Sequence, residues 1–206
     1  MLLALVVGLN RWTHGFEVWT FEGRRQLMLQ AGEVQALPVA LRGADGRVAR
    51  RWGRTEPASG AYLVDFVYTR CPSICRALGS EYQRMQRVLT GSRGAVSTSS
   101  AVHLVSISID LEHDDPAQLA RQAAAWGADP RHWTLAVPAT PEDADALLRS
   151  LGVVVVPDGQ GGFVHNGAVH LLDGRGRLRG LFEPEQWPAA LEAAQGLAAM
   201  RPEGAG

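Results

Sequence analysis

The sequence predicts an α/β fold in which helices cover a central β-sheet, and three observations support this prediction. Segments rich in β-branched and aromatic residues alternate with segments whose apolar residues recur every three or four positions. One strand-like run, Tyr62–Tyr68, leads directly into a helical pattern that extends to Leu89. The only two cysteines, Cys71 and Cys75, lie at this junction. An α/β sandwich built around the strand that precedes the cysteines is therefore expected.

The N-terminal region contains two features before that strand. The apolar run Met1–Leu9 is shorter than the roughly 20 residues that span a bilayer as a helix. Residues 1–16 are interpreted as the remnant of an export signal or membrane anchor that starts upstream, and a buried first strand is the alternative. Two short runs then flank the turn signal Asp45-Gly46, which predicts a β-hairpin over residues 39–48.

The rest of the chain alternates between strands and helices. Strands are expected over residues 101–110, 133–137, 164–172 and 177–182, and helices over residues 117–126, 140–151 and 188–200. Residues 153–156 are read as either a strand or a packed extension. Pro116 and Thr140 favour helix starts, and Gly127 favours a helix end. The last two strands flank residues 173–176 and predict a hairpin.

This order of elements describes a thioredoxin-like three-layer sandwich with an added N-terminal β-hairpin. The domain is expected over residues 17–200, and residues 201–206 are interpreted as a tail. The chain has 20 Lys and Arg residues against 21 Asp and Glu residues, so no nucleic-acid partner is indicated. The cluster Arg50, Arg51 and Arg54 around Trp52 is interpreted as a solvated surface, and His103 as a strand residue without a ligand role.

The cysteine pair has a reactive setting. Pro72 suits the first residue of a helix and so places Cys71 at the helix cap, where free N–H groups and the helix dipole favour a thiolate with a pKa below about 8.5. Three residues separate Cys71 from Cys75, which on a helix brings the two Cβ atoms to about 5–6 Å. The pair can share a metal ion or form a disulfide. A structural disulfide in an exported domain, or two unrelated core thiols, are the alternatives.

A distant histidine can complete the site. In a thioredoxin-like topology the loop before the last hairpin returns to the end of the cysteine-bearing strand, so His165, after a glycine-rich turn, can project over Cys71 and Cys75. Two thiolates and one imidazole would suit Cu(I) or Cu(II), and zinc accepts the same donors. An ordinary surface-loop histidine is the alternative.

Three motifs in order give the chain a specific resemblance. They are V-D-F-V-Y-T-R-C-P-S-I-C, V-S-I-S-I-D-L-E-H-D-D-P and H-N-G-A-V-H-L-L-D-G-R-G-R-L. With these motifs and the hairpin at Val39, the chain resembles the Sco/SenC family of copper-handling, thioredoxin-fold proteins over most of its length. The resemblance implies that Cys71, Cys75 and His165 are copper ligands and that residues 17–200 form a copper-binding domain. Asp110 matches an acidic residue that the family keeps beside the site.

The choice of His165 over His170 rests on its position eight residues before Asp173 in the last hairpin. Three departures from the family pattern surround the site. Family members commonly have Asp before the histidine and Ser or Thr after it, where this chain has Val164 and Asn166, and Leu111 stands where Pro is usual. These changes bear on the hydrogen bonds that orient the imidazole and leave the ligands themselves in place.

The resemblance also implies a function. The protein is expected to be tethered on the periplasmic side of the bacterial inner membrane, or in the equivalent mitochondrial compartment, and to support assembly of the binuclear copper site of cytochrome c oxidase. It would pass copper by ligand exchange to a copper-accepting subunit of the oxidase or another cuproprotein. Alternatively it would reduce the partner's copper-site cysteines, with attack by Cys71, resolution by Cys75 and regeneration by thiol reductants. Oxidation of the pair would abolish copper binding.

Two further classes of function are alternatives to copper delivery and thiol reduction. A metal-free thiol peroxidase or general reductase is disfavoured, because thioredoxin-type enzymes separate their cysteines by two residues and need no distant histidine. A sensor of copper or redox state is the third hypothesis.

Overall fold

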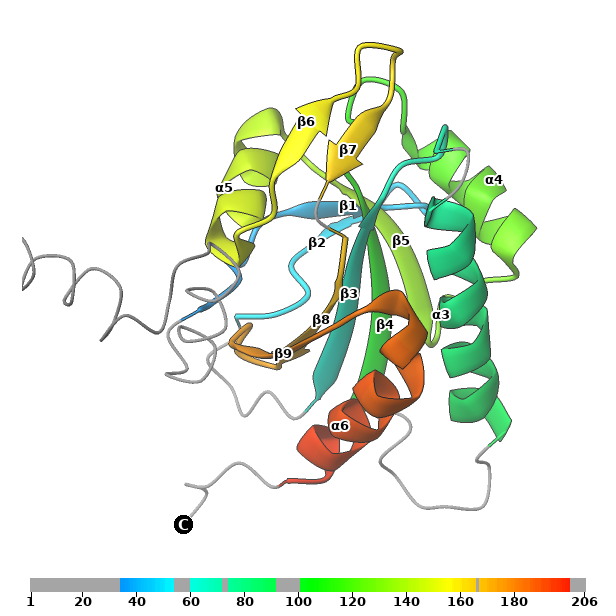
Figure 1. Ribbon diagram of the computed structural model, residues 1–206, viewed down its shortest axis with the longest axis vertical. Helices are drawn as coiled ribbons and strands as arrows, with labels where there is room; N and C mark the ends of the chain where they lie inside the picture. The colour runs from blue at the N-terminus through cyan, green and yellow to red at the C-terminus, as the bar shows by residue number, and fades with distance from the viewer. Residues whose placement is uncertain (1–33, 54–59, 72–73, 92–100, 166, 201–206) are drawn as a thin grey trace, which may run out of the picture.

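A seven-stranded mixed β-sheet forms the centre of the protein (Figure 1). The computed structural model describes residues 34–53, 60–71, 74–91, 101–165 and 167–200. The strand order is β2-β1-β5-β4-β3-β8-β9, and β3, β4 and β5 run parallel to one another. The bounds are β1 Leu41–Gly43, β2 Val48–Ala49, β3 Ala61–Val67, β4 Val102–Ser108, β5 Trp133–Pro138, β8 Val169–Asp173 and β9 Leu178–Phe182.

Helices cover both faces of the sheet, which confirms the thioredoxin-like three-layer sandwich. They are α3 Ile74–Gly91, α4 Pro116–Trp126, α5 Pro141–Leu151 and α6 Trp187–Ala199, which follows the short 3₁₀ helix η2 Pro184–Gln186. Buried residues of α3, α4 and α6 share one hydrophobic cluster with one face of the sheet. Leu147 and Leu151 of α5 belong to a second cluster on the other face, together with Trp52 and the segment that leads into β1.

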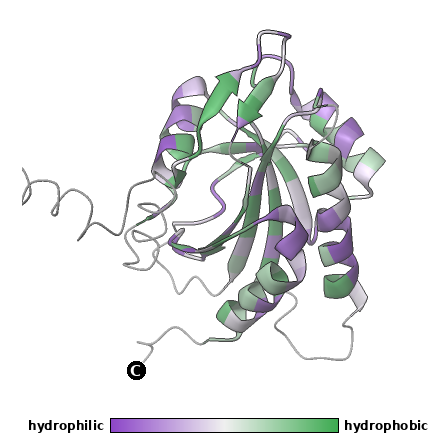
Figure 2. Ribbon diagram, viewed as in Figure 1, coloured by the Kyte–Doolittle hydropathy of each residue, from purple (hydrophilic) through white to green (hydrophobic). Residues whose placement is uncertain are grey.

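The central parallel strands are buried on both faces. Residues 63–67 of β3 and 104–108 of β4 are all buried, which explains their nearly continuous apolar sequences. Figure 2 shows hydrophobic residues along these strands, whereas the surrounding helices alternate between hydrophobic and hydrophilic residues. Asp65 is an exception, since its carboxyl group lies inside this core with 1% of the residue exposed.

The predicted helix boundaries are confirmed by their capping groups. The side chain of Asp115 caps the start of α4, where Pro116 is the first helical residue, and Gly127 ends the helix in the left-handed conformation at φ 62°. Thr140 caps α5 in the same way, and Gly152 ends it at φ 65°. The N-terminal hairpin is confirmed as well, as β1 and β2 pair antiparallel around the predicted turn.

The prediction of one strand over residues 164–172 is wrong. Two strands occupy this region: β7, Phe163–His165, pairs with β6, Val155–Pro157, in a separate two-stranded sheet, and only β8 joins the main sheet. A tight turn separates them, because the backbone N–H of Gly167 donates to the carbonyl of His165 at 3.0 Å. His165 therefore ends a different hairpin from the one predicted. Residues 153–156, read as a strand or an extension, contribute to β6.

The remaining domain predictions lie at the ends of the chain. Residues 1–16 and 201–206 fall outside the described residues, so the anchor and the tail stay predictions. Within the part of the chain that the structure describes, no helix has the length and apolar character needed to cross a membrane.

Candidate metal centre

Both cysteines lie where β3 leads into α3, as predicted. The backbone N–H of Cys71 donates to the carbonyl of Tyr68 at 3.1 Å, which closes a turn directly after the strand. The backbone N–H of Cys75, in the first turn of α3, donates to the Sγ atom of Cys71 at 3.3 Å. Both thiols are free. The first turn of α3 thus directs a backbone amide donor at the Cys71 sulfur.

The two thiols differ in exposure. Cys71 is half-buried, whereas Cys75 is 2% exposed. Burial is the main cause that raises the pKa of Cys75, and its contact with Cys71 adds to the effect. A partner molecule therefore reaches Cys71 first, with Cys75 behind it in the core.

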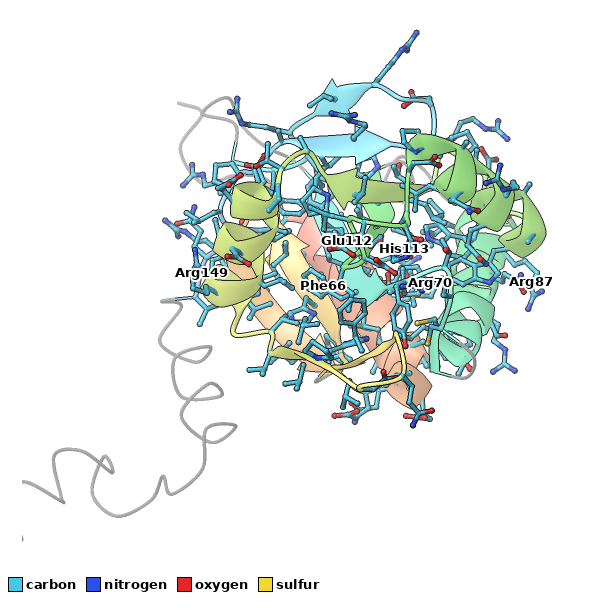
Figure 3. All side chains as sticks on the ribbon, turned by 90° about the horizontal axis from the view of Figure 1, so that it is seen from above. Phe66, Arg70, Arg87, Glu112, His113 and Arg149 are labelled. Carbon is cyan, nitrogen blue, oxygen red and sulfur yellow. The ribbon has the colours of Figure 1, made fainter. Side chains whose placement is uncertain are left out.

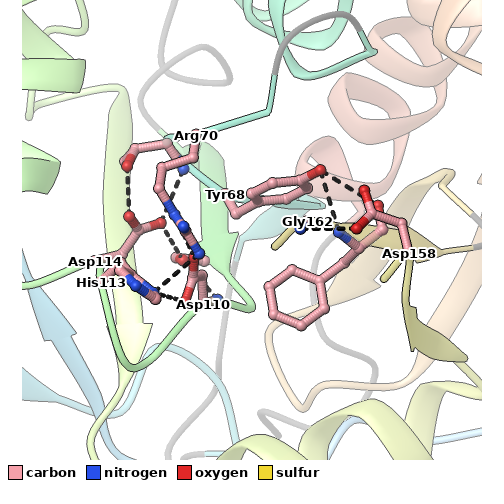
Figure 4. Close-up of polar contacts among 10 residues, drawn as sticks. Tyr68, Arg70, Asp110, His113, Asp114, Asp158 and Gly162 are labelled. Atoms are coloured by element: carbon pink, nitrogen blue, oxygen red, sulfur yellow. Dashed lines mark hydrogen bonds and ion pairs between the residues drawn. The ribbon is translucent and has the colours of Figure 1, made fainter. Parts of the chain in front are cut away.

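The β6–β7 hairpin is attached to this loop through Tyr68. The backbone N–H of Phe163 donates to the hydroxyl of Tyr68 at 3.3 Å, and the hydroxyl lies 3.3 Å from the Phe163 carbonyl, to which it donates. The two rings meet edge to face, with centroids 5.4 Å apart. Asp158 closes the tip of the hairpin by accepting from the backbone N–H of Gly162 at 2.9 Å (Figure 4). Because Tyr68 comes three residues before Cys71, the hairpin that carries His165 lies at the cysteine end of the sheet.

The His165 imidazole has unusual surroundings. Its Nδ1 and Nε2 atoms are both shielded from water, and neither has a hydrogen-bond partner among the described residues. Buried polar atoms are nearly always paired, so ring nitrogens without a partner among these residues are free to bind a ligand. Burial lowers the pKa of His165, which favours the neutral imidazole that binds metals. The donors of Cys71, Cys75 and His165 therefore have the chemistry that a copper ion needs.

The structure does not bring these three residues into one coordination sphere. Among the described residues, no group of three or more His, Cys, Asp or Glu side chains is arranged to hold a metal ion. His165 belongs to the separate two-stranded β6–β7 sheet. Hydrogen bonds between Phe163 and Tyr68 attach this sheet near the cysteines. The ligand set predicted from the sequence stays a prediction.

Asp110 lies beside the cysteine loop but is occupied by other partners. Its carboxylate, 2% exposed, accepts hydrogen bonds from Arg70 at 3.1 Å and 2.7 Å, and its other oxygen lies 2.9 Å from Nδ1 of His113. Burial alone would raise the pKa of Asp110, but the hydrogen bonds from His113 and Arg70 outweigh it and hold the pKa below its usual value. Figures 3 and 4 show Arg70 and His113 side by side. Asp110 thus anchors the residue that precedes Cys71.

A second carboxylate holds the same loop. Asp114 accepts from the backbone N–H of Thr69 at 2.9 Å and also from the Thr69 hydroxyl. It accepts a further hydrogen bond from the hydroxyl of Ser108 at 2.6 Å. Thr69 is therefore tied to the β4–α4 loop by both its backbone and its side chain, which limits the movement of the cysteine loop.

Sequence reasoning missed the partners in these contacts. Arg70, His113 and Asp114 were given no role, although the acid-rich loop after β4 was visible. The order of strands and helices could have indicated these contacts, because β3 and β4 are parallel neighbours and the segments that follow them meet at the same edge of the sheet.

The chain is similar to known proteins in both sequence and fold. The model of the SCO1/SenC family matches residues 47–200, more than half of the chain. The chain belongs to the SCO1/SenC family. The SCO1 protein homolog of Bacillus subtilis is 24% identical over 119 residues, which cover 57% of this chain and 58% of that protein. The alignment therefore spans less than two thirds of the length of this relative.

Two solved structures show the same fold. ScoI of Bradyrhizobium japonicum, with copper bound, superposes with a TM-score of 0.60 and 23% identity, covering 78% of this chain and 99% of that one. BsSco is a member of the Sco family of cytochrome c oxidase assembly proteins in which a disulfide switch has been identified. It superposes with a TM-score of 0.66 and 18% identity, covering 82% of this chain and 95% of that one. These similarities confirm the thioredoxin-like α/β fold of the family.

Proposed function

We propose that the protein binds copper through the thiolates of Cys71 and Cys75 and the imidazole of His165, and delivers it during assembly of cytochrome c oxidase. The observation that carries this proposal is the buried His165 imidazole, whose two nitrogens have no partner among the described residues, on a hairpin docked beside the cysteine loop. Thiolates select Cu(I), and an added imidazole also suits Cu(II). Membership of the SCO1/SenC family and the copper-bound relative favour copper over zinc.

The exposure of Cys71 supports delivery of the metal to a recipient. Copper is the cargo, and the recipient is a copper-accepting subunit of the oxidase or another cuproprotein. Cys71 is half-buried at the rim, so a thiolate or imidazole of the recipient can approach the metal there. Each new bond to the recipient replaces one bond to Cys71, Cys75 or His165. The contacts of Asp110 and Asp114 hold the loop so that the donors keep their positions between loading and release.

The same proposal places the protein on the periplasmic side of the bacterial inner membrane. Residues 1–16 would supply the anchor or export signal, and thiol reductants would keep the cysteine pair able to bind copper. Formation of a Cys71–Cys75 disulfide would remove both thiolate ligands. The disulfide switch identified in BsSco supports such a redox gate.

Copper titration of the full chain tests the proposal. Reduced protein is expected to bind one copper per chain, and Cys71→Ala, Cys75→Ala and His165→Ala are each expected to weaken binding. His132→Ala is the matched control, since His132 is half-buried and lies on the loop before β5. Oxidised protein should not bind. Stoichiometric binding by His165→Ala with the affinity of the control variant would remove His165 from the ligand set.

A second function is favoured by the unequal exposure of the two thiols. In this reaction the Cys71 thiolate attacks one sulfur of a disulfide in the partner's copper site, and a mixed disulfide forms as the other partner sulfur leaves as a thiolate. Cys75 then passes its proton to the partner thiolate that left first, and attacks the Cys71 sulfur. The partner's second thiolate is released, so that two electrons have passed to the partner and a Cys71–Cys75 disulfide remains.

Trapping experiments distinguish the two functions. With a peptide that contains a disulfide between two copper-site cysteines, Cys75→Ala is expected to accumulate the mixed disulfide and Cys71→Ala is not. Mass spectrometry of the unreduced protein measures the adduct. Efficient reduction of the peptide by a protein that binds no copper would establish the reductase function instead of delivery.

A further inference from the structure

A basic cavity lies on the sheet at the end remote from the cysteines. Its floor includes Tyr62 near the start of β3, His103 and Val105 on β4 and Thr134 on β5, and its volume is about 290 Å³. Val105 belongs to the hydrophobic cluster that α5 shares, so the cavity opens on the α5 face of the sheet. Cys71 follows the opposite end of β3, roughly 17 Å along the strand at about 3.3 Å per residue. The cavity is therefore separate from the candidate metal centre.

Three arginines line the cavity, and no acidic side chain does so among the described residues. Arg131 is paired with Asp129, whose carboxylate lies 2.6 Å from the guanidinium. Arg50 and Arg51 have no ion pair within the part of the chain that the structure describes. The Nε atom of Arg50 donates a hydrogen bond to the carbonyl of Pro38 at 3.0 Å. Among the residues that the structure describes, no carboxylate therefore compensates the charges of these two guanidinium groups.

Arg51 also carries a buried donor without an acceptor. Its Nε atom is shielded from water and has no hydrogen-bond partner among the described residues. Such a donor is costly unless an acceptor fills the adjacent space. His103 stacks on Tyr62, with ring centroids 5.3 Å apart. Burial, followed by the charges of Arg51 and His132, lowers the pKa of His103, which agrees with a positive potential in the cavity.

We propose that this cavity is a binding site for a phosphate group, either on a soluble phosphate compound or on the headgroup of an anionic lipid. Arg50 and Arg51 present planar donor groups that match phosphate oxygens, and the Thr134 hydroxyl is a further donor on the floor. The volume exceeds what one phosphate needs, so the cavity also has room for an organic substituent on the phosphate. The proposal goes beyond copper delivery and does not depend on it.

Titration of the full chain with inorganic phosphate, followed by calorimetry or amide chemical shifts, tests the site. We expect saturable binding with a dissociation constant near or below about 1 mM. Arg51→Gln and Arg50→Gln should each weaken binding by about tenfold or more, because each removes a charge-assisted hydrogen bond. Arg87→Gln is the matched control: it makes the same charge change at an exposed position on α3, which packs against the opposite face of the sheet from α5.

Vesicle sedimentation identifies the source of the phosphate. Binding to phosphatidylglycerol vesicles that exceeds binding to phosphatidylcholine vesicles, and that falls in Arg51→Gln but not in Arg87→Gln, supports the site and assigns it to a lipid headgroup. Saturable binding of inorganic phosphate that is lost in Arg51→Gln, without such vesicle binding, supports the site and assigns it to a soluble compound. Equal behaviour of Arg51→Gln and Arg87→Gln in both assays, or no binding in either assay, overturns the proposal. Circular dichroism confirms that each variant is folded, and Arg50→Gln provides an independent variant if Arg51→Gln is not.

Discussion

The buried carboxyl group of Asp65 makes the free energy of unfolding depend on pH in an unusual direction. Asp65 lies on β3 opposite Ser106 of β4, and its Oδ1 atom has no hydrogen-bond partner among the described residues. Burial raises the pKa of Asp65 from 3.8 to about 7, against the smaller lowering effect of Ser106. In the unfolded chain the same group titrates near its usual value of about 3.9. The folded protein therefore holds a proton that the unfolded chain has already released.

The sign and size of the effect follow from this difference. Between about pH 4 and pH 7 the folded state binds more protons than the unfolded state, so the free energy of unfolding falls as the pH rises. A shift of about three pKa units corresponds to about 4 kcal/mol in total, which is reached above about pH 7. Asp65→Asn removes the titration and should lose this slope. Relative to wild type, Asp65→Asn is expected to gain up to about 4 kcal/mol between about pH 4 and pH 8.

Urea unfolding of the reduced full chain, followed by circular dichroism across this pH range, measures the difference. Other carboxyl groups contribute equally to both proteins and cancel. Asp145→Asn is the matched control, because the Asp145 side chain is 69% exposed in a surface pair with Arg149, and its difference from wild type should stay nearly constant with pH. A difference between Asp65→Asn and wild type that is equally constant would refute the argument that burial governs this carboxyl group.

Three further predictions concern the loop, the hairpin and a helix cap. Asp110→Asn weakens a buried acceptor of Arg70 and should lower the free energy of unfolding by about 2 kcal/mol in urea unfolding at neutral pH. Because the pKa of Asp110 is lowered in the folded protein, the stabilisation by its carboxylate is lost as the pH falls below about 4. A stability difference between variant and wild type that stays unchanged at lower pH would contradict this prediction. Tyr68→Phe removes both hydrogen bonds to Phe163, and we expect weaker copper binding together with a loss of only about 1 kcal/mol in the free energy of unfolding. Wild-type copper affinity in this variant would show that other contacts hold the β6–β7 hairpin. Thr140→Ala removes the cap of α5 and should lower the free energy of unfolding by about 1 kcal/mol, with no effect on copper affinity.

Most of the fold could be predicted because it depends on local patterns. The run 62–68 has the residues of a buried strand, and the structure forms β3 there. Pro116 and Thr140 sit at helix starts because a proline or a capping side chain acts on backbone groups within the same turn. The turn at Asp45-Gly46 is likewise a property of adjacent residues, and Gly46 adopts φ 75°.

The split of the predicted strand 164–172 was missed. Apolar residues lie on both sides of the break, so periodicity continues through it, although Asn166-Gly167 between them is a turn signal of the same kind as Asp45-Gly46. The break arises because β8 pairs with β3 only as far as His170 opposite Val64, while β7 finds its partner in β6. The outcome is decided by pairing partners that lie six to ten residues away for β7 and more than a hundred residues away for β8.

The sequence by itself determined the donor groups available at the candidate metal centre and the place of the cysteines in the chain. Strand β3 ends before Cys71 and helix α3 begins before Cys75. Residues close to the cysteines in the sequence determine both boundaries. The tertiary structure alone decided which groups are buried and which are paired. The carboxylate of Asp110 contacts Arg70 forty residues away, and the nitrogens of His165 have no partner among the residues that the structure describes. Burial and pairing depend on surfaces contributed by distant segments, and only the folded chain brings those surfaces together.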